Sequence, residues 1–123
     1  MKTFLFTIVS ATILLSCSSQ NTGAITTDAT YGYSKDNPVK VGGVDSGPAN
    51  ERKYLNNLTG PNGEPVTFHR NGSCCAFETS NSSFGGMLDI YSVTYEGKGD
   101  TIKLYINMYD SAKLKAPLGF KMK

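Results

Sequence analysis

The sequence has little net charge, a single histidine and no apolar run long enough to cross a membrane. It carries 12 basic and 10 acidic residues, and one of the basic residues, Lys2, lies within the first 16 positions. A chain this close to neutrality has no charge excess for binding nucleic acid or for steering acidic ligands. Its main apolar stretch, residues 4–15, has about a dozen residues, whereas a membrane-spanning helix needs about 20. We therefore expect neither a nucleic-acid partner nor a transmembrane helix.

The first 17 residues resemble a bacterial lipoprotein signal peptide. Lys2 supplies the positive start, residues 4–15 supply the apolar segment, and Leu14-Leu15-Ser16-Cys17 is similar to a lipobox. In such a signal the Cys17 thiol takes a diacylglycerol group, and cleavage removes residues 1–16. An acyl chain on the new N-terminus then adds a further lipid chain, because one chain alone does not anchor a protein stably. We expect Cys17 to attach the mature protein to a membrane.

Downstream of the signal, the composition predicts a tether and one domain. Residues 17–30 begin at the lipidated cysteine, are otherwise small and polar, and contain one large apolar side chain, Ile25. A flexible segment of this length holds a domain roughly 20 Å from the bilayer. Residues 31–123 have the length and apolar content for a single small core, and not for a second domain.

The segment between residues 38 and 63 predicts a strand and then a helix. Pro38 opens a short run that ends at a glycine pair, which is typical of edge strands. Ser46-Gly47-Pro48 then begins a helix, because proline is well tolerated in the first turn. We expect Glu51 to complement the positive end of the helix dipole. The expected buried stripe of this helix is Tyr54, Leu55 and Leu58. The turn that ends the helix is Gly60-Pro61-Asn62-Gly63.

Two β-hairpins are predicted after the helix. The first joins residues 66–70 to residues 73–78 through Asn71-Gly72, a dipeptide that favours the type I′ turn. The second joins residues 87–95 to residues 101–109, and its second strand alternates between apolar and polar side chains. The predicted fold class is α+β, with one helix packed on a curled antiparallel sheet of about four to five strands, as in cystatin-like rolls.

The predicted hairpin also places the candidate reactive residues. It makes His69 and Cys74 cross-strand neighbours with Cα atoms about 4.5 Å apart, and it turns Cys75 to the opposite face. Four interpretations stay open: two free thiols that pack as small apolar side chains, a disulfide between Cys74 and Cys75, a metal site, and a nucleophilic thiol with His69 as its base. If the hairpin holds, both thiols are expected to be free, because adjacent strand residues face opposite ways.

Four tyrosines on the predicted polar side of the second hairpin form a candidate contact surface. They are either a second core layer under the C-terminal segment or an exposed aromatic patch for a partner. Charged residues of the strands are candidates for a polar cluster or a solvated face. The tyrosines are Tyr91, Tyr95, Tyr105 and Tyr109, and the charged residues are Glu64, Arg70, Glu78 and Asp89.

Five sequence blocks stand out between about residues 31 and 120: Pro38-Val39-Lys40-Val41-Gly42-Gly43, Gly47-Pro48-Ala49-Asn50-Glu51-Arg52, Gly60-Pro61-Asn62-Gly63, Gly72-Ser73-Cys74-Cys75 and Leu104-Tyr105-Ile106-Asn107-Met108-Tyr109-Asp110. These blocks resemble those of a family of small uncharacterised lipoproteins from Bacteroidota. Similar sequences sometimes carry the automatic name 2-dehydro-3-deoxyphosphooctonate aldolase, an enzyme whose eight-fold barrel takes 200 residues or more. The present chain is too short for that barrel, so we do not expect this activity.

The resemblance implies an envelope lipoprotein. Surface export in that phylum commonly uses acidic or lysine-rich residues after the lipidated cysteine, and Ser18-Ser19-Gln20-Asn21 lacks them. We therefore expect the outer membrane, with the domain facing the periplasm. The first functional hypothesis is a non-catalytic binding or accessory domain that docks on an envelope protein through the tyrosines or the Cys74-Cys75 hairpin. The second is a thiol or metal site at His69 and Cys74. No cofactor is expected for the first hypothesis.

Overall fold

The computed structural model of this chain describes residues 27–43 and 46–123. The predicted signal peptide, Cys17 and most of the predicted tether lie outside the described residues. The last part of that tether, from Asp28 to Thr30, forms a turn against the domain. Asp28 accepts hydrogen bonds from the backbone of Thr30 at 3.0 Å and from the side chain of Asn37 at 2.7 Å.

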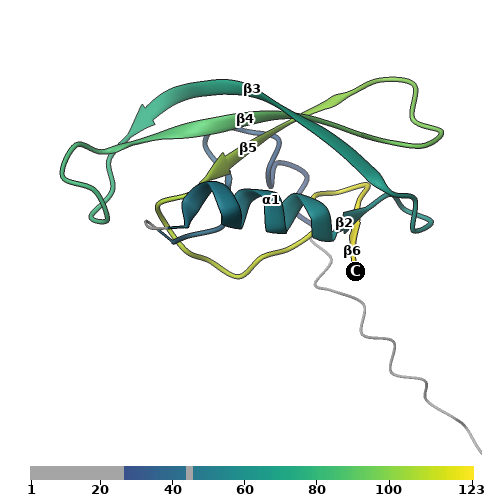
Figure 1. Cartoon of the computed structure of the whole chain (residues 1–123), viewed down its shortest axis with the longest axis horizontal. Helices are drawn as coiled ribbons and strands as arrows, with labels where there is room; N and C mark the ends of the chain where they lie inside the picture. Colours follow the sequence, from purple (N-terminus) through teal and green to yellow (C-terminus); the bar gives the residue numbers. More distant parts are fainter. Residues whose placement is uncertain (1–26, 44–45) are drawn as a thin grey trace, which may run out of the picture.

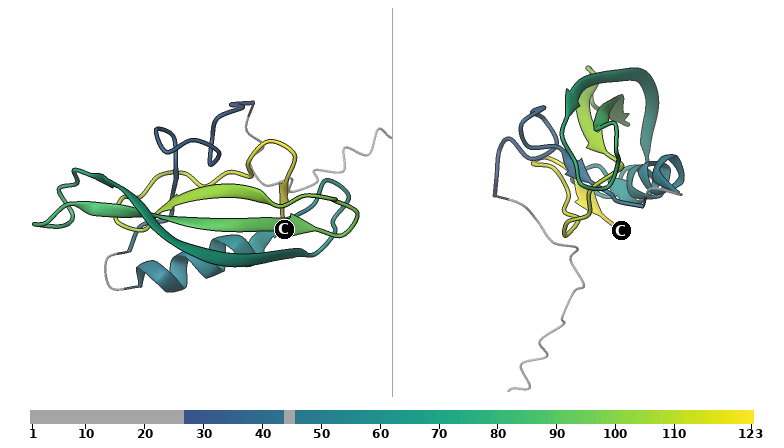
Figure 2. Two further views of the ribbon diagram at one scale, coloured as in Figure 1. Left: turned by 90° about the horizontal axis from the view of Figure 1, so that it is seen from above. Right: turned by 90° about the vertical axis from the view of Figure 1, so that its left-hand side faces the viewer.

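The fold is α+β, with one helix, a four-stranded mixed sheet and a small two-stranded sheet among the described residues (Figure 1). In chain order the elements are β1 (Val39–Lys40), α1 (Gly47–Asn57), β2 (Leu58–Thr59), β3 (Val66–Phe77), β4 (Gly86–Tyr95), β5 (Ile102–Asn107) and β6 (Lys121–Met122). The larger sheet has the strand order β1-β5-β4-β3, and β2 pairs with β6. Strands β3 and β4 run above α1 in Figure 1, and the sheet is bent in the end-on view of Figure 2.

The sheet differs from the prediction in the pairing of β1. Strand β1 lies at an edge, as predicted, but it pairs in parallel with β5, so the sheet is mixed and not purely antiparallel. Parallel neighbours need a long crossover connection. Here α1, β3 and β4 all lie between β1 and β5 in the sequence and supply that connection.

The predicted helix is present with Tyr54 and Leu55 buried, but it ends at Asn57, so the assignment of Leu58 to its buried stripe is wrong. Pro48 lies in the first turn of α1, and the chain becomes extended at Leu58, where β2 begins. Gly47 is required by a close approach, because a Cβ atom built there would lie 2.8 Å from the sulfur of Met108. The turn after β2 uses Gly63, whose φ of +85° is accessible to glycine. The buried helix residues are Gly47, Glu51, Tyr54 and Leu55.

The hairpin predicted at Asn71-Gly72 is wrong. Strand β3 runs continuously through this dipeptide, and both of its halves pair with β4: Arg70 faces Tyr91, and Gly72 faces Ile90. Asn71 is left as an extra residue in a β-bulge, and its side-chain amide donates to the Ser92 hydroxyl at 2.6 Å. The long strand β4 can pair along its whole length with an unbroken β3, whereas a hairpin at residue 71 would leave much of β4 unpaired.

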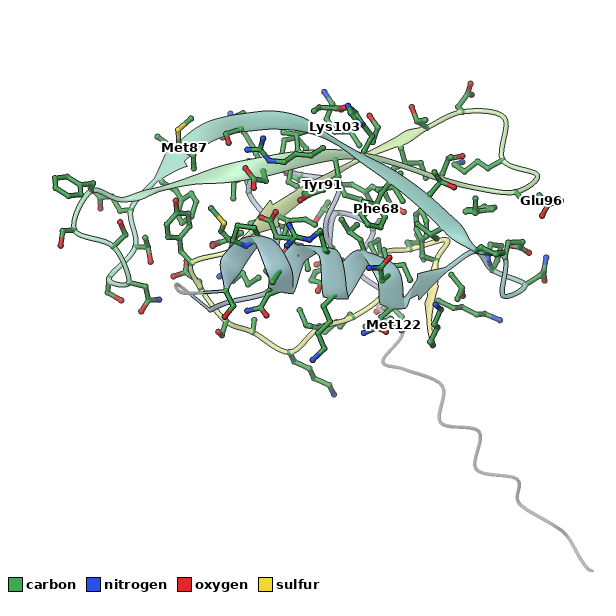
Figure 3. The ribbon with its side chains drawn as sticks, viewed as in Figure 1. Phe68, Met87, Tyr91, Glu96, Lys103 and Met122 are labelled. Atoms are coloured by element: carbon green, nitrogen blue, oxygen red, sulfur yellow. A yellow bond between two sulfur atoms is a disulfide. The ribbon has the colours of Figure 1, made fainter. Side chains whose placement is uncertain are left out.

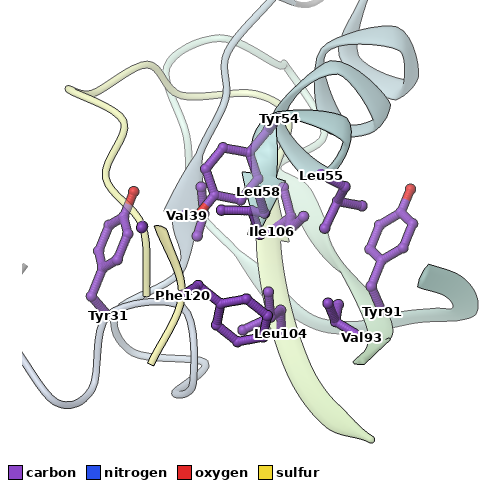
Figure 4. Close-up of a cluster of buried hydrophobic side chains, with 11 residues drawn as sticks. Tyr31, Val39, Tyr54, Leu55, Leu58, Tyr91, Val93, Leu104, Ile106 and Phe120 are labelled. Carbon is purple, nitrogen blue, oxygen red and sulfur yellow. The ribbon is translucent and has the colours of Figure 1, made fainter. Parts of the chain in front are cut away.

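The second predicted hairpin is confirmed, and it supplies much of the core. Strands β4 and β5 pair from Asp89–Ile106 to Val93–Ile102. The apolar side chains of one sheet face pack against α1 and against the C-terminal segment (Figure 4). The core residues are Tyr31, Val39, Tyr54, Leu55, Leu58, Tyr91, Val93, Leu104, Ile106, Ala116 and Phe120.

The C-terminal segment closes this core. Phe120 is buried, and β6 pairs antiparallel with β2. The Tyr54 hydroxyl donates a hydrogen bond of 2.8 Å to the carbonyl of Lys115, so the segment is tied to α1 as well. The C-terminal segment therefore packs against both α1 and β2.

The distal ends of β3 and β4 project beyond the first turn of α1. Residues 78–85 connect the two strands, and this part of the molecule extends past the helix in both views (Figures 1 and 2). We call residues 74–87 the arm. Asp110 fixes the base of the connecting loop, because its carboxylate accepts hydrogen bonds from Thr79 at 2.6 Å and Asn81 at 3.0 Å.

Candidate functional site

The two adjacent cysteines form a disulfide at the start of the arm. Cys74 and Cys75 are bonded through their sulfur atoms, with Cα atoms 3.7 Å apart. A second β-bulge lies here: Cys74 faces Leu88 and Ala76 faces Met87, so Cys75 has no partner on β4. Cys75 has a φ of +60°, which is unusual for a residue other than glycine. The expectation of two free thiols is therefore wrong, since it assumed a regular strand.

The predicted His69–Cys74 site is not formed. Both residues lie on β3, where His69 faces Ser92 and Cys74 faces Leu88. Four positions of β4 separate those partners, which corresponds to roughly 13 Å along the strand. The proximity of His69 and Cys74 depended on the hairpin that the structure lacks. Among residues 27–43 and 46–123, no group of three or more histidine, cysteine, aspartate or glutamate side chains could hold a metal ion.

The four tyrosines do not form one exposed patch. Tyr91 is 4% exposed and lies in the core. The ring of Tyr95 packs edge-on against Phe120, with centroids 5.6 Å apart. Tyr105 faces Ile90 on β4, on the sheet face away from Tyr91. For Tyr91 and Tyr95 the alternative of a core layer under the C-terminal segment therefore holds, and the exposed contact surface is wrong for Tyr91. The other tyrosines are distributed over different parts of the domain.

Tyr109 packs against the arm. Its ring packs edge-on against Phe77 with centroids 5.8 Å apart. A cavity of about 230 Å³ lies beside this pair, between the arm, β1 and the end of β5. Its lining residues are Lys35, Asp36, Pro38, Lys40, Phe77, Glu78, Leu88, Asn107 and Asp110. The lining combines apolar side chains with charges of both signs.

A hydrogen-bonded network around two buried carboxyl groups joins α1 to the sheet. Glu51 on α1 has no exposed surface, and it accepts a hydrogen bond of 2.8 Å from the Tyr91 hydroxyl. Asp89 on β4 is 4% exposed and is held by Arg70 at 2.9 Å and by the Ser73 hydroxyl at 2.8 Å. Figure 3 shows Tyr91 between the sheet and the helix, next to Phe68. We call these five hydrogen-bonded residues the acid network: Glu51, Arg70, Ser73, Asp89 and Tyr91.

The two carboxyl groups of the acid network have opposite pKa shifts. Burial is the main cause that raises the pKa of Glu51 to about 8; the hydrogen bond from Tyr91 acts to lower this pKa, and the neighbouring Asp89 acts to raise it. Burial also acts to raise the pKa of Asp89, but hydrogen bonds from Arg70 and Ser73 outweigh it and hold this pKa below its usual value. The Glu51 Oε1 atom accepts no hydrogen bond from the described residues. A protonated Glu51 that donates to the ionised Asp89 accounts for all three observations.

The sequence reasoning grouped Arg70 and Asp89 as candidates for a polar cluster, and the structure brings them together. Glu64 instead accepts a hydrogen bond of 3.1 Å from the backbone of Asn62, and Glu78 lies at the base of the arm. Glu51 was assigned to the helix dipole, which missed its buried position. Its spacing of three, four and seven residues from the apolar stripe of α1 is a signal that could have identified it.

The acid network and the arm differ in how far their side chains are exposed to solvent. The Glu51, Asp89 and Tyr91 side chains of the network are buried between α1 and the sheet and support the fold, whereas the Arg70 side chain is 51% exposed. The arm instead presents large apolar side chains to solvent: Phe84 is fully exposed and Met87 is 47% exposed. The candidate functional surface is therefore the arm.

Comparison with known proteins found no matching family model, no matching curated protein and no matching solved structure. None of the helices in the described part of the chain has the length and apolar character that crossing a membrane requires.

Proposed function

We propose that this protein is a lipid-anchored accessory protein of the outer membrane that faces the periplasm and binds another envelope protein without catalysing a reaction. Lipid on Cys17 holds it to the membrane, residues 17–30 act as the tether, and the domain adopts a cystatin-like roll. The contact surface is the tip of the arm. The resemblance of the first 17 residues to a lipoprotein signal supports the anchor.

The observation that carries the binding function is the exposure of Phe84. This aromatic side chain is fully exposed in the loop that joins β3 to β4, and Met87 is exposed nearby. Burying such a ring in a partner's pocket removes its apolar surface from water, and aromatic residues commonly provide most of the binding energy at interfaces. A structural role within this domain would not leave Phe84 in solvent.

The composition of the arm favours a protein partner over a lipid surface. Residues 74–87 contain no lysine or arginine and one acidic residue, Glu78. Anionic lipids attract basic residues, and each contributes about 1 kcal/mol near the surface. An aromatic side chain in a loop of serine, threonine and asparagine instead fits a pocket with a polar rim on another protein.

Site-specific photo-crosslinking in intact cells tests this proposal. A photoreactive phenylalanine derivative is placed at Phe84 and, in a matched variant, at Glu96, which is exposed in the β4–β5 turn at the other end of the sheet (Figure 3). We expect a discrete protein adduct from position 84 and none from position 96. Equal adducts from both positions, or none from position 84 at native expression, would refute the arm as the contact surface.

The anchor needs a separate measurement. The intact mass of the mature protein should show cleavage before Cys17 and lipid on that residue. The Cys17→Ala variant should remain unprocessed or become soluble, and its crosslinking from position 84 should decrease. A Cys17→Ala variant that fractionates with the outer membrane as the unmodified protein does would show that the lipid is not the anchor.

A further inference from the structure

The Cys74–Cys75 disulfide lies where it is open to another molecule. Strand β3 is an edge strand of the four-stranded sheet, and both cysteines are partly exposed. The disulfide closes a small ring between adjacent residues and coincides with the bulge at Cys75. It therefore crosslinks no distant parts of the chain, and a role in stapling the domain does not explain it.

The bulge at Cys75 decides which face the end of β3 presents. With the bulge, Ala76 faces Met87 and Phe77 faces Gly86. Without it, regular pairing would continue from Cys74–Leu88, and each later residue of β3 would move by one position. A shift of one residue turns every following side chain to the opposite face of a sheet. Phe77 would then leave the face that it shares with Leu88.

The position of Phe77 determines the wall of the cavity beside the arm. Its ring packs edge-on against Tyr109, and it lines the cavity of about 230 Å³ together with Leu88 and Asn107. A Cβ atom built on Gly86 would lie 2.6 Å from the Phe77 ring, so the bulged register also accounts for glycine at position 86. The two cysteines thus control the cavity through the backbone, without lining it.

We propose that the Cys74–Cys75 disulfide is a reducible site that accepts electrons from a dithiol, and that its reduction opens the cavity by turning Phe77 away. A thiolate of the dithiol attacks one sulfur, breaks the Cys74–Cys75 bond and forms a mixed disulfide. The second thiol of the donor then releases the protein. The protein gains two electrons and two protons as two thiols, and the donor becomes a disulfide. This inference does not depend on the partner proposed for the tip of the arm.

Backbone conformation supplies the reason for a change on reduction. Cys75 has a left-handed φ of +60°, which a side chain disfavours. The covalent ring with Cys74 holds the bulge in place while the disulfide is intact. Once the ring is open, Cys75 is free to return to extended backbone and pair with Met87.

The first test follows thiols and side-chain contacts in the purified mature protein in detergent. We expect no alkyl additions by mass spectrometry before reduction and two after treatment with dithiothreitol. In the oxidised protein, nuclear Overhauser effects should connect the Phe77 and Tyr109 rings, and reduction should remove them. Contacts between Val93 and Leu104 in the core should persist in both states, which distinguishes a local change from unfolding.

Two double variants separate the disulfide from the bulge. Cys74→Ser with Cys75→Ser removes the ring and should resemble the reduced protein. Cys74→Ser with Cys75→Gly also removes the ring, but glycine accepts a positive φ, so the bulge and the Phe77–Tyr109 contact should remain. This second variant is the matched control, since both variants lack the sulfur atoms.

Three outcomes would overturn the proposal. The first is alkylation of both cysteines without reductant, and the second is resistance of the disulfide to dithiothreitol in the folded protein. The third is retention of the Phe77–Tyr109 contact after reduction and in the variant with Cys74→Ser and Cys75→Ser.

Discussion

Replacing Glu51 with glutamine should make the domain more stable at neutral pH and remove most of its pH dependence. Glu51 is completely buried, accepts a hydrogen bond from Tyr91 and lies next to the ionised Asp89. Glutamine keeps the shape of the protonated acid and can donate an N–H where the acid donates its O–H. It carries no proton that must be taken up on folding.

The magnitude follows from the pKa of Glu51. Burial raises this pKa from 4.5 to about 8. Between these two values the folded protein holds one proton that the unfolded chain has released, so the free energy of unfolding falls by about 1.4 kcal/mol per pH unit. From pH 4.5 to pH 7 the loss is roughly 3 kcal/mol by this relation. The stabilisation is complete below pH 4.5, and it is lost as the pH rises through 8.

Asp89 has the opposite dependence. Burial opposes its ionisation, but the hydrogen bonds from Arg70 and Ser73 keep its pKa below the usual value of 3.8. Its contribution is present above that pH and is lost as the pH falls through the lowered pKa. The two groups together predict maximum stability near pH 4 to 5, with a decline on both sides.

The assay is urea denaturation of the unmodified protein, Glu51→Gln and Glu78→Gln at a series of pH values from 4 to 9. Glu78 is exposed at the base of the arm, so its variant controls for the loss of one carboxylate. We expect Glu51→Gln to be more stable at pH 7 by about 1–3 kcal/mol, with a flat profile above pH 5. A stability that falls with pH as steeply in Glu51→Gln as in the unmodified protein would refute a protonated Glu51.

Two further substitutions test the packing around α1. Gly47→Ala should destabilise the domain by about 1–3 kcal/mol, because the new Cβ would collide with Met108, although alanine normally favours a helix. The control in thermal denaturation is Gly99→Ala, since a Cβ at position 99 would have no atom within 4 Å. A gain in stability for Gly47→Ala would contradict the close approach between Gly47 and Met108. Tyr91→Phe should cost about 1–2 kcal/mol, because it removes the hydrogen bond to the buried Glu51. A change below about 0.5 kcal/mol in urea denaturation would show that this bond adds little.

Elements with a strong local period could be predicted from the sequence. The stripe of Tyr54 and Leu55 identified α1, and the alternation around Leu104 and Ile106 identified β5 and its pairing with β4. In both elements the local pattern and the tertiary packing favour the same structure. The parallel pairing of β1 with β5 was missed because no local feature of a two-residue strand encodes the direction of a distant partner.

Asn71-Gly72 shows the limit of a local signal. The dipeptide favours a tight turn, but the energy of that turn competes with the whole ladder that an unbroken β3 forms with β4. The ladder prevails, and Asn71 becomes a bulge bound to Ser92. The predicted thiol or metal site was wrong for the same reason, because only the hairpin placed His69 and Cys74 close together.

The prediction of free thiols at Cys74 and Cys75 was wrong for a different reason, and that reason supports the proposed role of the bulge. In a regular strand Cys74 and Cys75 point to opposite faces and cannot bond, so the expectation of free thiols was correct for the geometry it assumed. A disulfide between them requires a break in the strand, and the structure has that break at Cys75. A positive φ at a cysteine has no signature in the sequence, since the residues that usually mark it are glycine and asparagine. The bulge and the disulfide therefore accompany each other in the structure, and a chain that loses the disulfide but has no glycine at position 75 should have no local preference for keeping the bulge.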